Sequence, residues 1–151
     1  MGALAKLAPS LPPMSDQAVR VVSKLAELSL LRPQVPLKTS HLFHAGVYSR
    51  TIVIPAGTML TGVLIKIPTV VIVSGDAKVF VGDKTVHLTG CQVLPASSNR
   101  KQAYFSLAET SITMIFATTA KTVEEAEMEF TDEFESLMSH GLENDVIITG
   151  E

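Results

Sequence analysis

The chain has 151 residues, a length that suits one domain, and 46% of them are hydrophobic against 18% charged. This composition supplies a core and excludes global disorder, and no stretch approaches the roughly 18–20 uninterrupted apolar residues of a membrane-spanning helix. The net charge of −3 is unevenly distributed. Residues 1–121 hold all 12 Lys and Arg and 5 of the 15 acids, a net +7, whereas residues 122–151 hold the other 10 acids. This asymmetry predicts charge pairing within the fold, between subunits or with a partner.

The residue types present exclude several classes of protein. Cys91 is the single cysteine, which rules out an intramolecular disulfide and a cysteine-based zinc site. The first residues lack a basic start followed by an apolar run, so secretion by a signal peptide is not expected. Basic residues are scattered and tryptophan is absent, so nucleic-acid binding is not expected either.

The N-terminal part predicts one helix between two irregular segments. Residues 1–13 are rich in Ala, Leu and Pro, and we interpret them as a flexible arm that a neighbour could order. Ser15 or the next residue can cap a helix, and apolar residues at helical spacing predict an amphipathic helix over Asp16–Leu31. Pro33 ends it, so residues 14–37 are expected to form this helix and a Pro-rich linker.

From Ser49 the hydrophobic period changes to two, which is typical of strands. Turn-forming residues separate segments rich in β-branched side chains. The predicted strands are Arg50–Ile54, Met59–Ile67, Thr69–Ser74, Ala77–Val81, Thr85–Leu88, Gln92–Leu94, Gln102–Leu107 and Ser111–Thr118. Many short strands without helices between them predict a mainly β domain, a sandwich or barrel, over residues 38–121.

The last segment, residues 122–151, is expected to form an acidic helix and a tail. Thr122 to Glu125 is a capping box. The apolar face of the helix that follows holds Val123, Ala126, Phe130, Phe134, Leu137 and Met138, and its acids, Glu127 among them, occupy the other face. So many like charges repel one another, so the helix should dock on its own or a neighbouring barrel, with Arg50, Arg100 and Lys101 as partners. These basic and apolar residues are the interface candidates. Val146–Thr149 could be one more strand or part of the tail.

The order of strands and turns resembles that of the cupins, and several local sequences are similar to the cupin-like proteins of tailed phages and prophages. The matching segments are His41–Arg50, Ile54–Thr58, Leu60–Gly62, Ser74–Gly75, Asn99–Lys101, Ala108–Thr110 and Thr122–Glu125. The resemblance spans residues 38–130. It implies a cupin-like jelly-roll barrel, here with an N-terminal helix and a C-terminal amphipathic helix.

The resemblance also shows where metal ligands would lie. In that group, a strand after the Thr-Gly pair carries two histidines four residues apart, and a later strand ends in a third. The aligned positions here are Ile65, Thr69 and Phe116, none of which is an effective metal ligand. No carboxylate lies between Leu28 and Gly75. We therefore expect an apolar barrel without metal or other cofactor, and no cupin catalysis.

Two histidine pairs suggest other chemistry. His41 and His44 could form a metal pair on a helix, but an extended segment places them on opposite sides, and we favour that interpretation. His87 lies four residues from Cys91, so a cysteine–histidine nucleophile is conceivable. The simpler interpretation is two unrelated strand residues beside a tight turn, because no third group is evident to orient the imidazole.

A basic pair beside an aromatic residue leaves a further choice open. Arg100 and Lys101, near Tyr104, could bind an anion such as a phosphate or carboxylate. The alternative is an exposed loop with no ligand, which we favour at this point.

Together these observations predict a non-catalytic, metal-free structural or interaction protein of phage or prophage origin. We expect a homo-oligomer that belongs to the virion or its assembly, with other virion proteins as further partners, in the virion or the cytoplasm of the infected host. The alternative is a small-molecule-binding or vestigial cupin enzyme that uses the mouth of the barrel. Its polar groups would be His41, His44, Tyr48, Arg100 and Tyr104.

Overall fold

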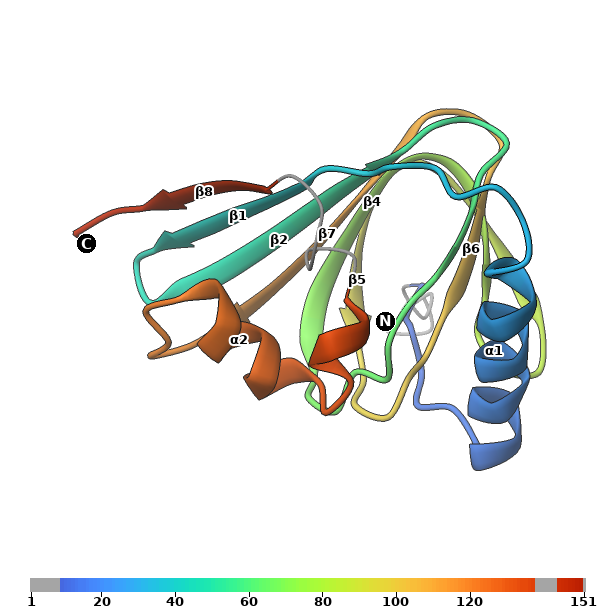
Figure 1. Ribbon diagram of the computed structural model, residues 1–151, viewed down its shortest axis with the longest axis horizontal. Coiled ribbons are helices and arrows are strands. Elements are labelled where there is room, and N and C mark those ends of the chain that lie inside the picture. The colour runs from blue at the N-terminus through green and yellow to red at the C-terminus, as the bar shows by residue number, and fades with distance from the viewer. Residues whose placement is uncertain (1–8, 138–143, 151) are drawn as a thin grey trace, which may run out of the picture.

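The computed structural model of the chain describes residues 9–137 and 144–150. Eleven elements occur in these residues, and most of them are strands (Figure 1). In chain order they are α1 Asp16–Ser29, β1 Thr39–His44, β2 Val47–Ile54, β3 Met59–Thr61, β4 Thr69–Phe80, β5 Thr85–Ala96, β6 Ala103–Ser106, β7 Thr110–Ala117, α2 Val123–Phe130, the 3₁₀ turn η2 Phe134–Ser136 and β8 Asn144–Ile148. The predicted mainly β architecture, with a helix on each side of it in sequence, is confirmed.

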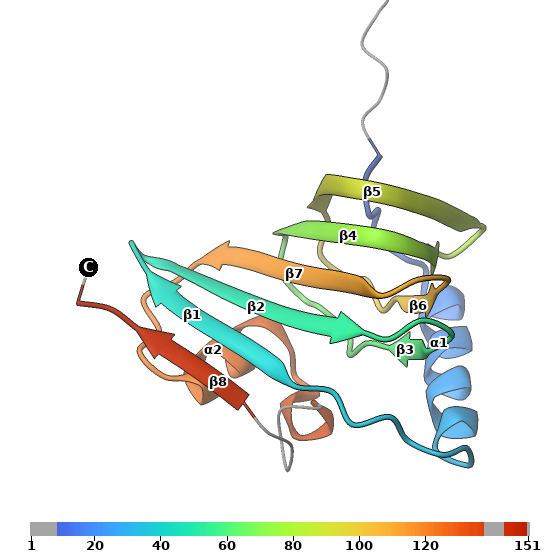
Figure 2. The ribbon, with the colours of Figure 1, turned by 90° about the horizontal axis from the view of Figure 1, so that it is seen from above.

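The strands form one curled sheet. Its order is β3-β6-β4-β7-β2-β1-β8, with β5 on the other edge of β4. Figure 2 shows β5, β4, β7, β2, β1 and β8 lying side by side, with α2 below them and α1 beyond β6. The long strand β4 pairs with β7 over Val70–Ser74 and with β6 over Ala77–Phe80, while β5 follows its whole length. This change of partner part-way along β4 curls the sheet around a concave face.

A glycine explains why β4 is one bent strand and not the two predicted strands Thr69–Ser74 and Ala77–Val81. Gly75 has φ +145°, and a Cβ there would lie 2.5 Å from the Thr110 Oγ1. Gly75 faces Gly90 of β5, which has φ +72°. Because both strands bend without losing register, the predicted turns become bends in continuous strands.

The segment before the first predicted strand is also a strand. β1 pairs antiparallel with β2, and its other edge pairs in parallel with β8. The C-terminal segment, for which the sequence left a strand or a tail open, therefore forms strand β8, which begins at Asn144. In sequence it lies more than a hundred residues from β1, and local patterning carries no information about such a pairing.

The N-terminal residues need two corrections. Leu11 does not belong to a free arm: it is 2% exposed, its N–H donates to the Pro95 carbonyl, and it packs in the main core. Residues 1–8 of the predicted arm lie outside the described residues. Helix α1 begins as predicted, with the Ser15 Oγ accepting the Ala18 N–H at 3.1 Å, but it ends at Ser29, two residues early.

The acidic helix is shorter than predicted. The Thr122 Oγ1 accepts the Glu125 N–H, which confirms the N-cap. Helix α2 ends at Phe130 because Thr131 is extended, and the Thr131 side chain accepts the Glu133 N–H. A separate 3₁₀ turn follows. A hydroxyl that bonds to a nearby amide offers the backbone an alternative to helix, and that competition ends the helix here.

Candidate functional site

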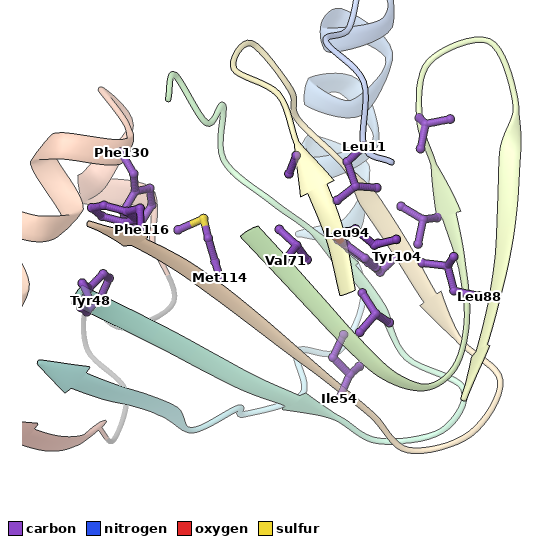
Figure 3. Close-up of a cluster of buried hydrophobic side chains, with 14 of the residues drawn as sticks. Leu11, Tyr48, Ile54, Val71, Leu88, Leu94, Tyr104, Met114, Phe116 and Phe130 are labelled. Carbon is purple, nitrogen blue, oxygen red and sulfur yellow. The ribbon is translucent and has the colours of Figure 1, made fainter. Parts of the chain in front are cut away.

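The concave face of the sheet carries a pocket of about 130 Å³ that is open to solvent on one side. Apolar residues make up most of its wall, and the polar lining comes chiefly from Arg50, Arg100, Gln102 and Tyr104. The full lining is Arg50, Ile52, Leu60, Thr61, Gly62, Val63, Ile65, Val71, Arg100, Gln102, Tyr104, Ile112, Met114, Phe130, Ser136 and Leu137. Figure 3 shows several of these side chains, with Val71 between Met114 and Tyr104 and with Met114 on the side of Phe130. An apolar pocket with a few convergent polar groups is the usual form of a small-molecule site.

Arg100 is the most deeply buried charged residue of the pocket, with 1% of its surface exposed. Its NH1 donates to the carbonyls of Ser97 at 2.6 Å and Ile67 at 3.3 Å, and its NH2 donates to the Thr69 Oγ1 at 2.7 Å. The NH2 also faces the Met114 sulfur at 3.7 Å. Among the residues that the structure describes, no carboxylate pairs with this guanidinium. A buried charge without a counter-charge is costly, which makes Arg100 unusual.

Burial shifts the pKa values of two neighbouring groups in the pocket. It lowers the pKa of Arg100 to about 10, so the side chain is still charged at neutral pH. It raises the pKa of Tyr104 to about 12, against the smaller opposing effect of the positive charge of Arg100, so the phenol is neutral and can donate. The pocket therefore presents a cation and a neutral hydroxyl donor side by side.

Residues 100, 102 and 104 alternate along the segment that runs from the isolated bridge at Arg100 into β6, where Tyr104 lies. All three line the pocket. The Gln102 Nε2 is buried and has no hydrogen-bond partner in residues 9–137 or 144–150. Within those same ranges, the Tyr104 hydroxyl makes no hydrogen bond. Three side chains of one short segment thus bring polar atoms to the pocket wall. The fold does not use all the hydrogen-bonding capacity of these atoms.

Arg50 reaches the pocket from β2 and is held differently. Its NH1 donates to the Glu127 Oε2 at 2.9 Å, and both side chains are buried. The Arg50 guanidinium also lies over the Phe130 ring, 5.6 Å from its centroid. Glu127 was expected on the exposed acidic face of the helix. It is 2% exposed, because the concave sheet buries that side of α2 and Arg50 supplies the counter-charge.

A hydrogen-bonded chain extends from Arg50 to β1 and β8. The Arg50 NH1 donates to the Tyr48 hydroxyl at 3.5 Å, and that hydroxyl lies 2.7 Å from the His41 Nδ1. The His41 Nε2 lies 2.7 Å from the Asn144 Oδ1, an acceptor, so the neutral tautomer with the proton on Nε2 fits all partners. Burial is the largest influence on the pKa of His41 and lowers it below 6.5.

The acidic segment docks on its own barrel through further pairs. The Lys101 Nζ donates to the Glu133 Oε1 at 2.9 Å, and the Glu133 Oε2 accepts the Leu64 N–H at 2.6 Å. Lys66 and Asp132 form an exposed pair at 2.7 Å. The predicted partners Arg50 and Lys101 are thus confirmed within one chain. The prediction is wrong for Arg100, which binds carbonyl and hydroxyl oxygens instead.

The apolar interface candidates largely pack inside the chain. Phe130 is fully buried, with its ring against Phe116 at 6.0 Å between centroids, and Leu137 is buried as well. Val123 and Phe134 are partly buried against the same core. Met138 lies outside the described residues. Phe130 and Leu137 are therefore core residues of this chain and not the free surface that an interface with a neighbour needs.

The residues that the cupin resemblance aligns with metal ligands do not fit a metal. Ile65 lines the pocket, the Thr69 hydroxyl accepts from Arg100, and Phe116 packs against the Tyr48 and Phe130 rings. No His, Cys, Asp or Glu occurs in the described lining, and no group of three such residues occurs in the described part of the chain. Two guanidinium groups in the wall would also repel a cation.

The two histidine pairs are separated. His41 points into the fold and His44 is exposed, as alternation along β1 requires, and His44 bonds to the Thr149 Oγ1 at 2.8 Å. His87 pairs with Asp76. Cys91 is exposed four residues further along β5, about 13 Å away at the rise of a strand. Neither the metal pair nor the nucleophile pair is brought together, and the proposed ligand set of His41, His44 and Tyr48 lies apart from Tyr104.

Comparison with known proteins concerns the fold only. The sequence matches no protein-family model, and a search of curated proteins finds no match. Among solved structures, the chain is similar to a cupin superfamily protein from Desulfitobacterium hafniense, with 15% identity, a TM-score of 0.44, and 60% of this chain and 87% of that chain covered. The predicted cupin-like fold is confirmed.

Two of the similar solved structures are named as enzymes. Ectoine synthase from P. lautus shares 18% identity at a TM-score of 0.47, with 66% of this chain and 76% of that chain covered. Salicylate 1,2-dioxygenase from Pseudoaminobacter salicylatoxidans shares 14% identity at 0.48, with 76% and 35% covered. These names describe those proteins, and the likenesses extend to fold alone.

Sequence reasoning missed three residues that matter to the site. Gln102 was seen only as the start of a strand, although its spacing from Arg100 and Tyr104 is a signal that could have found it. Glu127 and Glu133 were two of many acids in one segment. Nothing local distinguishes them, because their roles depend on which barrel residues they meet.

No helix in the described ranges is long and apolar enough to cross a membrane.

Proposed function

We propose that this chain is a non-catalytic, metal-free binding protein of cupin-like fold that holds a small, largely apolar molecule in the pocket of its sheet. The observation that carries this proposal is the pocket itself, about 130 Å³ with apolar walls and three polar side chains at alternate positions. The donor set supports binding without a metal, because the described lining has no imidazole, thiolate or carboxylate.

The absence of tryptophan from the chain offers a direct test. Leu60, a lining residue on β3, can be replaced by Trp to place a single fluorophore at the pocket. We expect toluene, benzyl alcohol or benzoate to change its emission saturably. The matched control is Val93→Trp, since Val93 is 62% exposed on β5 and does not line the pocket. If no probe affects Leu60→Trp more than Val93→Trp, the proposal is wrong.

Elemental analysis tests the metal-free part of the proposal. Protein purified without chelators should carry far less than one equivalent of zinc, iron, manganese or nickel. Stoichiometric metal that survives dialysis would contradict the proposal.

A second candidate function is self-association, the structural role that the sequence resemblance implies for a virion or its assembly. One observation favours it: the convex face of the sheet exposes apolar side chains across paired strands. Leu42 faces Ser49, Ser49 faces Ile115, and Ile115 faces Val70. Leu42, Val70 and Val93 are all exposed, and contiguous exposed apolar surface is typical of association sites.

Sedimentation at several protein concentrations tests this second candidate. We expect an oligomer that Val70→Lys with Val93→Lys dissociates. The control is Val21→Lys on α1, since Val21 is 51% exposed, between Val70 at 43% and Val93 at 62%. A monomeric wild type, or an oligomer that the double variant leaves intact, would contradict assembly through this face.

A further inference from the structure

We propose that the ligand of the pocket is a small organic monocarboxylate, with its carboxylate at Arg100, Gln102 and Tyr104 and its apolar body against the aliphatic walls. This inference rests on the proposed binding function and specifies its ligand class. The argument comes from the charge of the lining, the donors that the fold leaves available and the size of the pocket.

The charge balance of the lining calls for one negative charge. Arg50 and Arg100 are the two charged residues of the described lining. Glu127 supplies the counter-charge of Arg50. Arg100 is more deeply buried, yet within the described ranges only neutral oxygens and a sulfur contact its nitrogens. The described lining therefore carries one uncompensated positive charge, and a monoanion neutralises it without bringing excess charge into an apolar site.

The available donors match a carboxylate. A guanidinium has five N–H donors. Arg100 directs three of them to oxygen atoms and one to the weakly accepting Met114 sulfur, which is itself in the pocket wall. The Tyr104 hydroxyl and the Gln102 Nε2 add neutral donors from two further residues of the pocket wall. An ionised carboxylate only accepts hydrogen bonds, at its two oxygens. It can lie in the plane of a guanidinium and accept two parallel N–H bonds from it. A neutral amide would bring its own donors and leave the charge of Arg100 in place.

The size and the apolar walls of the pocket limit the part of the ligand that is attached to the carboxylate. An apolar protein cavity of roughly 150 Å³ holds a benzene ring, and this pocket is slightly smaller but open to solvent, at about 130 Å³. The carboxylate and a few carbon atoms therefore fill the closed part of the pocket, and the rest of a six-carbon ring or chain extends into its open mouth. Sugars and nucleotides do not fit these walls, because Ile52, Val71 and Ile112 offer their hydroxyls no partners. A dianionic phosphate would exceed the single uncompensated charge.

The direct test compares benzoate with benzamide, which have nearly the same shape and differ in charge. Binding is measured by the emission of Leu60→Trp and independently, for wild type, by saturation-transfer NMR of the probe. We expect benzoate to bind at least about tenfold more tightly than benzamide at pH 7, and inorganic phosphate not to compete with benzoate.

Two variants locate the carboxylate, and a third is their control. Arg100→Met should remove the preference for benzoate, and Tyr104→Phe should weaken benzoate several-fold while leaving benzamide nearly unchanged. Lys101→Met is the matched control, because it removes a buried cation one residue away that pairs with Glu133 and does not line the pocket. It should change the affinity for benzoate by less than about twofold. If Arg100→Met does not fold, Tyr104→Phe and Gln102→Leu still decide the outcome.

The outcomes separate this inference from the function on which it rests. Equal binding of benzoate and benzamide would overturn the carboxylate assignment and leave a pocket for neutral apolar molecules. Benzoate binding that phosphate competes away, or that Lys101→Met weakens as much as Arg100→Met, would overturn it in favour of nonspecific attraction of anions. No saturable binding of any probe would overturn both the ligand class and the binding function.

Discussion

Arg50 reaches the pocket from β2 and Arg100 from the segment between β5 and β6, and the two are held differently. Arg50 faces a buried carboxylate on α2, and its pairing fastens that helix to the concave sheet. Arg100 is more deeply buried, but the described residues offer it only carbonyl, hydroxyl and thioether acceptors. The first arrangement is complete within the chain, whereas the second leaves a charge for something else to neutralise. The two buried arginines therefore differ chiefly in whether the described part of the chain supplies a counter-charge.

The largest effect should come from removing the carboxylate of the complete pair. Glu127→Leu keeps a good helix former in α2 and takes away the Arg50 counter-charge. Breaking a buried ion pair from one side costs about 3–5 kcal/mol in the free energy of unfolding, which urea denaturation would measure. The double variant Arg50→Met, Glu127→Leu should recover most of that loss. A single-variant cost below about 1 kcal/mol would mean that the pair does not fasten α2.

The two arginines should differ when each is replaced by Met in the ligand-free protein. Arg50→Met leaves the Glu127 carboxylate buried, so its cost should be of the same order as that of Glu127→Leu. Arg100→Met loses hydrogen bonds worth about 1–3 kcal/mol, but it also removes an uncompensated buried charge, which offsets part of the loss. Urea titrations should therefore find Arg100→Met the more stable of the two. The reverse order would contradict the difference drawn between these sites.

A smaller effect is expected where the acidic segment meets the rim of the barrel. Burial of Glu133 acts to raise its pKa, but the Leu64 N–H and Lys101 lower it by more, and the net shift is downward from 4.5. A lowered carboxyl pKa gives stability that is present above pH 4.5 and lost as the pH falls through the folded value. Glu133→Gln should cost about 1 kcal/mol at pH 7, because the group is half-exposed. The difference from wild type should shrink at pH 3 in urea titrations. A difference that stays constant with pH would contradict this role.

The smallest effect should be a pH dependence at the Arg50 end of the pocket. Burial lowers the pKa of His41 below 6.5, so the unfolded chain takes up the proton first, and stability falls as the pH drops below about 6.5. Thermal unfolding between pH 7.5 and 5.5 should show this loss in wild type and less of it in His41→Gln. Equal losses in the two proteins would assign the dependence to other groups.

Local patterning predicted the elements well where neighbours in sequence decide the structure. The capped start of α2 at Thr122 and the start of α1 at Asp16 follow from hydroxyl caps and helical spacing. The predicted turn at Gly75 became a bend, because Gly90 stands opposite it and lets β4 and β5 bend together. Pairing across the sheet decided that outcome, and no short window of sequence contains it.

The candidate site was only half visible from the sequence. The sequence allows an anion site at Arg100 and Lys101 near Tyr104 but favours an exposed loop, whereas the structure buries Arg100 and Tyr104. The sequence does not distinguish Glu127 from the other acids of its segment, because its partner Arg50 is 77 positions away along the chain. His41, His44 and Tyr48 were grouped with Tyr104 by residue type, and only the fold shows that they lie apart.

The difference between the two arginines can be observed directly in one spectrum. In protein labelled with ¹⁵N at arginine Nε, buried Nε–H groups exchange slowly enough to be resolved, and Arg50→Lys and Arg100→Lys assign the two resonances. On addition of benzoate, we predict that the Arg100 resonance shifts saturably, that the Arg50 resonance shifts far less, and that benzamide moves neither by a comparable amount. An Arg100 resonance that does not move when benzoate is added would contradict the central claim that this guanidinium is the anchor of the pocket.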